Sequence, residues 1–295
     1  MIYESLSAEG KKLIDPEYPF TKIADGFRFL EGPVWHPYEK HLTFSDIMGN
    51  ALYRWIPQDG VTLLKQNSYL TNGNTYDRSG CLISCEHGTS SLSKMNKDGS
   101  RTVLADSYNG KGLNSPNDAV VRSDGLIYFT DPVSGRNEKF GIPRKPELAF
   151  SGVYVYNPKD RSLQLLVNDF EKPNGLCFSP DEKYLYVNDT IRQHIRKFSV
   201  DKSGKISGGE VLCDLILDGP GVADGLKVSK DGLLFCSAPR GIQIFSPNGN
   251  IVGRLYVPEF PANFTWGGPE LDMLFLCSTT TLYSVRTSIK GIPVL

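Results

Sequence analysis

The sequence predicts an all-β fold, a six-bladed β-propeller with a central metal channel. A repeating unit occurs six times, and short segments rich in β-branched and aromatic residues recur within it. Segments such as LIYFT (126–130) and YLYVN (184–188) have the composition of packed strands. Hairpin turns are indicated by Asp-Gly or Asn-Gly pairs at 59–60, 98–99, 124–125, 231–232 and 248–249.

Each unit opens with an acid or an amide, continues through an apolar segment and reaches a turn. The clearest copies begin at Pro116, Pro173 and Ala223. The opening residues are Glu31, Asn72, Asn117, Asn174, Asp224 and Asn263. The steps between them, 41, 45, 57, 50 and 39 residues, fit a blade of four strands with loop insertions in the longer units. We therefore expect residues 1–295 to form a single propeller domain.

The ends of the chain and two insertions complete this plan. A propeller has to close its ring, so we expect the segment at 20–29, FTKIADGFRF, to contain a strand that completes the last blade. Residues 1–20 are interpreted as an N-terminal extension. Segments 107–114 and 134–149 interrupt the repeat. The second contains two prolines and mixed charge, and it is either a surface excursion or a lid over the channel mouth.

The composition excludes several classes of partner. The formal net charge is −1 and the Lys and Arg residues are scattered, so we expect no nucleic-acid partner. No apolar run reaches membrane-spanning length, so we expect no membrane contact. The N-terminus lacks the apolar segment of a signal peptide, which predicts a cytoplasmic protein. Removal of a signal peptide would instead make it periplasmic or secreted.

The six cysteines do not suggest a disulfide framework. Cys81 and Cys85 lie four residues apart in one predicted strand, roughly 13 Å from each other and beyond disulfide reach. No CxxC pair occurs, which excludes a zinc ribbon. Buried reduced thiols are the expectation, again in a cytoplasmic protein. For the assembly we expect a monomer or a weak homodimer.

The repeat has a chemical consequence. The innermost strand of each blade lines the channel, so the six opening residues form a ring of two carboxylates and four amides. Such oxygens suit one hard divalent cation, with calcium as the first expectation. An alternative is that Asn-Gly pairs merely form turns. Turn formation would explain Asn72, but it does not explain Glu31, a carboxylate beside apolar Val34 and Trp35.

At these residues the chain resembles the gluconolactonase, regucalcin (senescence marker protein) and luciferin-regenerating enzyme family. The similarity extends from about Phe27 to Ser284. It rests on an ordered series of motifs, EGPVWHP, LTFSDI, CEHG, LNSPND, YFTDP, KPNGLCFSPD, ADGL and WGGPELDMLFLCS. CEHG, LNSPND and YFTDP look like the bacterial gluconolactonase branch.

The resemblance implies one divalent metal in the channel, usually calcium, with Fe²⁺, Zn²⁺, Mn²⁺ and Mg²⁺ as alternatives. It implies Glu31, Asn174 and Asp224 as metal ligands. Asn117 corresponds to a fourth ligand in some members and to a water-mediated contact in others. The carboxylate that matches Asp224 is also the proposed general base, which makes Asp224 the catalytic residue. Ser115 stands where the animal branch has an arginine that contacts sugar lactones, and we expect it among the substrate-binding residues.

Further candidates for substrate binding surround this ring. Asn72 and Asn117 offer hydrogen-bond partners for hydroxyl groups. Asp131 and Asp189 either border the pocket or cap turns. His87, in CEHG, either reaches the channel or is a structural histidine held by hydrogen bonds.

These residues predict a metal-dependent hydrolase that opens a small lactone, such as the sugar lactone gluconolactone. Asp224 would activate water or attack the substrate directly. No GxSxG or HExxH motif offers another mechanism. The alternatives are a phosphotriesterase-like or aryl-esterase hydrolase on the same metal, and a non-enzymatic calcium-binding scaffold. A polar inner ring predicts few apolar walls, which favours a lactone over a phosphotriester.

Overall fold

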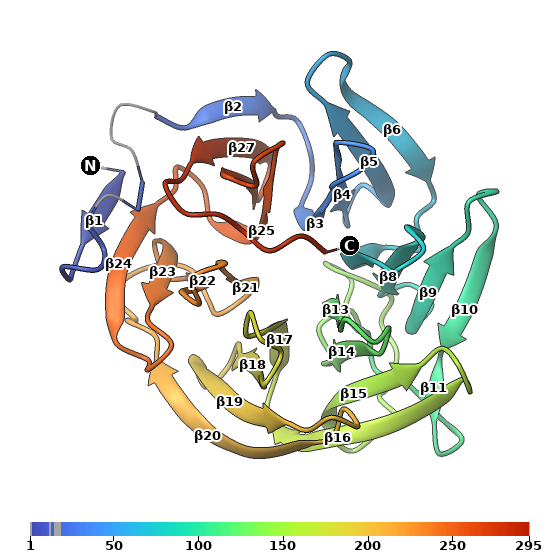
Figure 1. Cartoon of the computed structure of the whole chain (residues 1–295). Helices are drawn as coiled ribbons and strands as arrows, with labels where there is room; N and C mark the ends of the chain where they lie inside the picture. Colours follow the sequence, from blue (N-terminus) through green and yellow to red (C-terminus); the bar gives the residue numbers. More distant parts are fainter. Residues whose placement is uncertain (1, 12, 15–18, 295) are drawn as a thin grey trace.

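The computed structural model describes residues 2–11, 13–14 and 19–294 of the chain. Its main strands form six antiparallel sheets arranged around a central axis (Figure 1). Five of these sheets have four strands each and one has five. The described residues contain no helix that could cross a membrane. The predicted six-bladed propeller is confirmed.

The first three blades take their strands in chain order. The first contains β3 (Leu30–His36), β4 (His41–Asp46), β5 (Ala51–Ile56) and β6 (Gly60–Gln66). The second contains β7 (Thr71–Tyr76), β8 (Leu82–Glu86), β9 (Ser91–Met95) and β10 (Arg101–Ala105). A small hairpin follows, β11 (Ser107–Tyr108) and β12 (Lys111–Gly112). The third blade contains β13 (Ala119–Val121), β14 (Ile127–Asp131), β15 (Ser151–Asn157) and β16 (Ser162–Phe170).

The last three blades include the strands that close the ring. The fourth contains β17 (Pro173–Phe178), β18 (Tyr184–Asp189), β19 (His194–Val200) and β20 (Ile206–Asp214). The fifth contains β21 (Leu226–Val228), β22 (Leu234–Ala238), β23 (Gly241–Phe245), β24 (Ile251–Tyr256) and β1 (Tyr3–Ser5). The sixth contains β25 (Pro261–Gly267), β26 (Met273–Ser278), β27 (Thr281–Arg286) and β2 (Thr21–Ala24).

Both N-terminal strands pair with C-terminal blades. Thr21 of β2 lies opposite Ser284 of β27, so the predicted closure of the last blade is confirmed. The segment at 1–20 also contributes β1, where Glu4 pairs with Arg254. That fifth strand was not predicted. Positions 1, 12 and 15–18 of the extension lie outside the described residues.

Aromatic side chains pack between neighbouring blades. Phe235 of the fifth blade meets Trp266 of the sixth, with ring centroids 4.9 Å apart. Tyr128 of the third blade meets Phe178 of the fourth at the same separation, 4.9 Å. Burial of each such side chain stabilises the fold by about 1.5–3 kcal/mol. These contacts fix each blade relative to the next, which keeps the inner strands in place.

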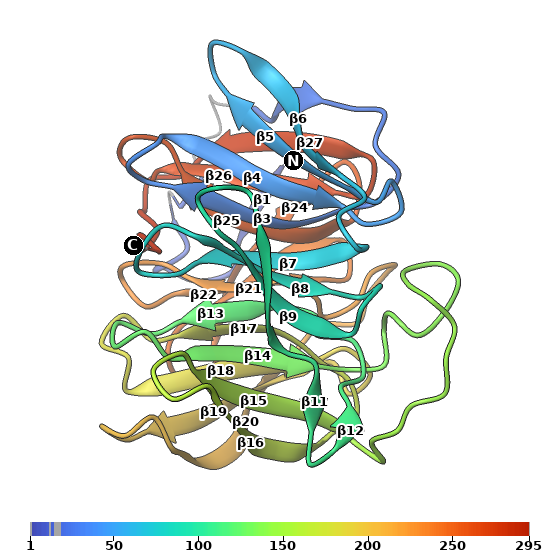
Figure 2. The ribbon, with the colours of Figure 1, turned by 90° about the vertical axis from the view of Figure 1, so that its right-hand side faces the viewer.

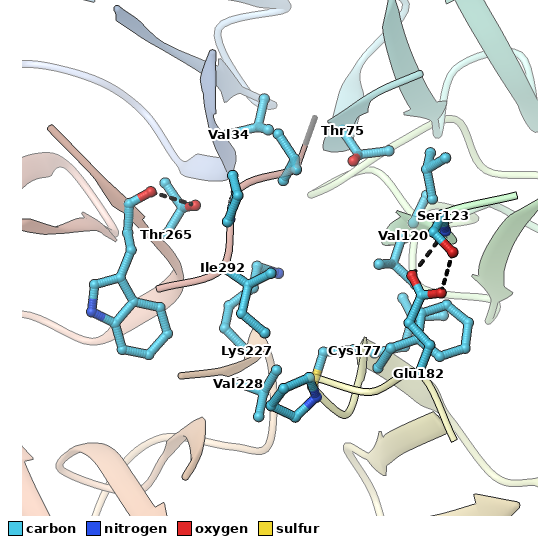
Figure 3. Close-up of a pocket in the computed structure, with 18 of the residues that line it drawn as sticks. Val34, Thr75, Val120, Ser123, Cys177, Glu182, Lys227, Val228, Thr265 and Ile292 are labelled. Carbon is cyan, nitrogen blue, oxygen red and sulfur yellow. Dashed lines mark hydrogen bonds between the residues drawn. The ribbon is translucent and has the colours of Figure 1, made fainter. Parts of the chain in front are cut away.

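The two faces of the ring carry different segments. In Figure 2 the loop between β14 and β15 projects on the right, whereas the C-terminus lies on the left. The C-terminal segment bridges to Ser229 through Gly291 and crosses this end of the channel. A cavity of about 510 Å³ lies there, with Ile292 and Lys227 among its walls (Figure 3). Insertion 134–149 therefore lies on the opposite face from the tail.

Candidate functional site

The inner strands lose their regular register at the opening residues of the repeat. The pairing of β3 with β4 shifts between Glu31 and Val34, and that of β17 with β18 shifts between Pro173 and Leu176. β7 and β25 show equivalent shifts at their own channel residues. A bulge of this kind re-aims a side chain relative to its strand. It explains how these residues lie at the channel although their neighbours pack between blades.

The glycines that follow the channel residues allow adjacent blades to approach closely. Gly73 donates its N–H to the carbonyl oxygen of Asn117 (2.8 Å), and Gly175 donates to that of Asp224 (3.1 Å). A Cβ added to Gly175 would overlap the Asp224 carbonyl oxygen. Both glycines lie within strands, β7 and β17, and neither has a positive φ, so they are not turn residues. Close packing of blades, rather than turn formation, accounts for the Asn-Gly pairs here.

A cavity of about 370 Å³ opens at this point on the face of the insertion. It is lined by five of the six predicted ring residues, Glu31, Asn72, Asn117, Asn174 and Asp224. The sixth, Asn263, lies behind the wall and donates from Nδ2 to Oε2 of Glu31 (3.0 Å). The structure thus brings residues of five blades to one small-molecule-sized space.

The floor of the cavity carries two buried carboxylates. Oε2 of Glu31 accepts the N–H of Gly32 at 2.7 Å, and burial raises the pKa of Glu31 well above its usual range. Burial and the charge of Glu31 together raise the pKa of Asp224. Two such groups within one buried space are costly when both are ionised. A divalent cation between them would supply the missing positive charge.

The amides present oxygen to the same space. Asn174 donates from Nδ2 to Oγ1 of Thr190 (3.0 Å), and that hydroxyl donates to the carbonyl of Ala223 (2.8 Å). The first of these bonds uses the amide nitrogen of Asn174, so Oδ1 of Asn174 takes no part in it and is one of the oxygens that this wall residue can offer a cation. Asn117 is pinned through its backbone, since its N–H donates to the carbonyl of Thr130 (2.8 Å).

Two carboxylates and two amide oxygens fit a hard cation such as calcium. Among the described residues, no group of three His, Cys, Asp or Glu side chains is placed to hold a metal ion. The present site has a different composition, since it combines two acids with amides. Asp118, a third acid near the channel, is neutralised by Lys227, whose Nζ lies 3.2 Å from Oδ2.

His87 connects the ring to the insertion. Its Nδ1 lies 2.8 Å from the carbonyl oxygen of Phe140, which can only accept, so Nδ1 carries the proton. Burial lowers the pKa of His87 to about 4, so the ring is neutral at pH 7. Nε2 must then accept from Nδ2 of Asn72, 3.2 Å away. His87 lines the cavity, but both of its nitrogens are occupied.

The insertion lies over the cavity mouth. Four of its residues belong to the wall, Ser134, Asn137, Lys139 and Phe140. The Phe140 ring contacts Phe29 with centroids 4.8 Å apart. Arg144 donates to the carbonyls of His87 (2.8 Å) and Gly88 (2.9 Å). The insertion is thus fastened to the second blade rather than extended into solvent.

Three predicted substrate contacts do not reach the wall. Ser115, Asp131 and Asp189 have no exposed surface and lie outside the cavity lining. Ser115 donates from Oγ to the carbonyl of Pro132, and Asp131 accepts the N–H of Asn114 (2.8 Å). Burial raises the pKa of Asp131 to about 7. Both acids end the second strand of their blades, one strand away from the channel.

These acids instead hold the backbone that leads into the ring. Asp189 accepts N–H groups from the segment before Asn174. Asp46, at the same place in the first blade, accepts from Arg28 (3.0 Å) and Phe29 (2.9 Å), just before Glu31. An acid at the end of the second strand therefore positions the channel residue of its own blade.

The cavity wall also contains residues that the sequence did not indicate. Five apolar side chains line it, Phe29, Ile47, Phe140, Val222 and Phe260. The expectation of few apolar walls was therefore wrong. Thr190, Lys139 and Lys172 line it as well. Lys172 could have been found, because it directly precedes the Pro-Asn-Gly motif, whereas Lys139 lies in a segment without a repeat pattern.

Comparison with known proteins gives consistent matches. Residues 29–280 match the SMP-30/Gluconolactonase/LRE-like region family model. A gluconolactonase from Zymomonas mobilis is 32% identical, over 95% of this chain and 84% of its own. A pentonolactonase from Haloferax volcanii is 26% identical, over 87% and 84% of the two chains. A gluconolactonase structure from Xanthomonas campestris superposes with a TM-score of 0.90 at 31% identity, covering 97% and 95%.

Proposed function

The chain belongs to the SMP-30/Gluconolactonase/LRE-like family and is a lactonase, and we propose that it opens a small sugar lactone with the help of one divalent cation, calcium in the first instance. The observation that carries the proposal is the pair Glu31 and Asp224 on the floor of an open cavity. A sealed channel would have favoured a structural cation without catalysis. An accessible cavity of about 370 Å³ leaves room for a substrate above the acids.

The residues divide the chemistry between them. Glu31, Asn117, Asn174 and Asp224 would hold the cation, which when bound polarises a carbonyl and stabilises developing negative charge. Asp224 accepts a proton from the water that attacks the carbonyl carbon. The ring C–O bond then breaks, and Asp224 returns the proton to the ring oxygen, which leaves as a hydroxyl and gives a hydroxy acid. Direct attack by the Asp224 carboxylate is the alternative to water activation.

The other wall residues bind and enclose the substrate. Asn72 is oriented by His87 and lies beside the floor, where it can contact a hydroxyl group. Segment 134–149 acts as a lid in this proposal, since Phe140 lies on the wall and its carbonyl is bonded to His87. A lid excludes bulk water other than the attacking molecule.

Metal dependence is tested by elemental analysis and by two variants. One cation per chain should be found, lost to a chelator and regained with calcium. Asp224→Asn should lower kcat by at least about a hundredfold while some metal remains bound. Glu31→Gln should weaken metal binding first. Wild-type kcat for Asp224→Asn at saturating metal would refute the assigned role.

The substrate class is tested by comparing kcat/KM for δ- and γ-sugar lactones with paraoxon-like triesters and aryl esters at equal metal occupancy. The proposal requires lactone turnover well above spontaneous hydrolysis. Absence of that turnover would refute it.

A second candidate, an aryl-ester or phosphotriester hydrolase on the same site, is favoured by one observation. The aromatic rings of Phe29, Phe140 and Phe260 give the cavity apolar surface for an ester arm. A clear preference for a triester or aryl ester in the same assay would select this candidate.

The six cysteines, all free thiols, support the proposed cytoplasmic location.

A further inference from the structure

Two lysine side chains lie on the wall of the site cavity. Lys139 belongs to the insertion and is exposed, whereas Lys172 precedes β17 and is half-buried. They come from different blades and from segments far apart in the chain. The cavity therefore has two acids on its floor and two ammonium groups on its walls.

Among the described residues, neither ammonium group has a carboxylate at ion-pair distance. Within the described part of the chain, no carboxylate forms an ion pair with Lys139 or Lys172, although Lys227 is paired with Asp118 (3.2 Å). Glu171, the neighbour of Lys172, lies 3.8 Å from the side chain of Arg192 instead. The two charges on the cavity wall thus form no ion pair with a carboxylate of the described residues.

The backbone of both lysines is held by hydrogen bonds. The N–H of Lys139 donates to Oδ1 of Asn137 (2.9 Å), and its Nζ lies 4.9 Å from the centre of the Phe140 ring on the wall. The N–H of Lys172 donates to Oδ1 of Asp189 (3.2 Å).

Lys172 lines the same cavity as Glu31 and Asp224 on its floor. A molecule bound above these acids therefore lies within reach of the Lys172 side chain.

We propose that the cavity takes lactones that carry a second, anionic group such as a carboxylate, and that Lys139 and Lys172 bind that group. The inference rests on the proposed lactonase function. The reacting carbonyl lies at Glu31 and Asp224, and the anionic end lies at the lysines. This arrangement orients the substrate, because the two ammonium groups attract the anionic end and leave the lactone carbonyl at Glu31 and Asp224. Long-range attraction would also increase the rate of entry.

The test compares two lactones that differ only at the far end. D-Glucaro-1,4-lactone has a carboxylate where D-glucono-1,4-lactone has a hydroxymethyl group. The wild-type enzyme should show a kcat/KM ratio that favours the anionic lactone by about tenfold, and each of Lys139→Gln and Lys172→Gln should reduce this ratio at least about threefold. Lys145→Gln removes the same charge from the same insertion, away from the wall, and should keep the ratio.

An unchanged ratio in both variants would overturn the inference. If Lys172→Gln slowed both lactones equally, Lys172 would act on Asp224 and not on the substrate. If neither lactone were turned over, the proposed function would fail separately. In that case, calorimetric titration of the metal-loaded protein with glucarate and gluconate would still test the inference. It requires that glucarate, the dianion, binds more tightly than gluconate and that Lys139→Gln weakens glucarate binding. Equal affinities for the two would refute the inference.

Discussion

Asp189 offers the sharpest test of how the fold positions the site. Its buried carboxylate accepts four backbone N–H groups, from Glu171 (2.8 Å), Lys172 (3.2 Å), Ile191 (3.0 Å) and Arg192 (3.2 Å). Asp189→Ala removes all four acceptors at once. With about 1 kcal/mol for each lost bond, the free energy of unfolding should fall by about 4 kcal/mol.

Asp189→Asn separates the contributions of the two oxygens. Three of the donors use Oδ1, which an asparagine keeps, and only Glu171 uses Oδ2. An amide nitrogen in place of Oδ2 would face the Glu171 N–H, so the free energy of unfolding of this variant should fall by about 1–2 kcal/mol. Asp160→Ala is the control, because Asp160 is exposed and accepts the N–H of Ser162 (2.9 Å) at the surface. The free energy of unfolding of Asp160→Ala should fall by less than about 1 kcal/mol.

The assay is urea unfolding followed by tryptophan fluorescence, together with calcium titration of the folded protein. Both Asp189 variants should bind calcium more weakly than the control, because Asn174 lies two residues beyond Lys172. A loss below about 1 kcal/mol in Asp189→Ala, or unchanged calcium affinity, would refute the idea that this acid positions the ligand.

Three further predictions concern the lid, a buried acid and the channel. Gly135→Ala places a Cβ against the His87 ring, so kcat/KM should fall at least about tenfold, and a wild-type value would contradict the lid contact. The raised pKa of Asp131, about 7 against an ordinary 3.8, means that the native state binds more protons between these values. Wild-type stability should therefore fall from pH 4 to 7 relative to Asp131→Asn and stay level above, as chemical unfolding at each pH would show. Lys227→Met leaves Asp118 buried without its partner and should lower the unfolding free energy by about 3 kcal/mol, most of which the added change Asp118→Asn should restore.

The sequence was sufficient for the fold because the pattern is repeated. Six repeat units that open with equivalent residues, spaced by the length of one blade, are compatible with a single architecture, a closed ring of six blades. Closing that ring requires an N-terminal strand such as β2. β1 was missed because its residues, Tyr-Glu-Ser, show no apolar alternation. Its pairing with β24 depends on an edge that only the finished blade presents.

The ring residues of the site were predictable for the same reason, since equivalent positions in a propeller share one channel. Glu31 in particular stood out as a carboxylate among apolar residues. Asp131 and Asp189 could not be placed, because a strand end does not reveal on which strand of the blade it lies. Lys139 depends on how a loop without periodicity folds back over the mouth, which local sequence does not specify.

The bond between Asn263 and Glu31 joins the last blade to the first, and it has a consequence for how the protein is made. During synthesis Glu31 emerges early, whereas Asn263 follows 232 residues later. The carboxylate of Glu31 therefore has no bond from this amide until the sixth blade has been synthesised. The cavity floor is thus complete only in a chain whose two ends have met. A cation bound there would connect blades from both sides of this seam and resist its opening. Calcium binding by nascent chains of increasing length would then report the moment at which the ring closes.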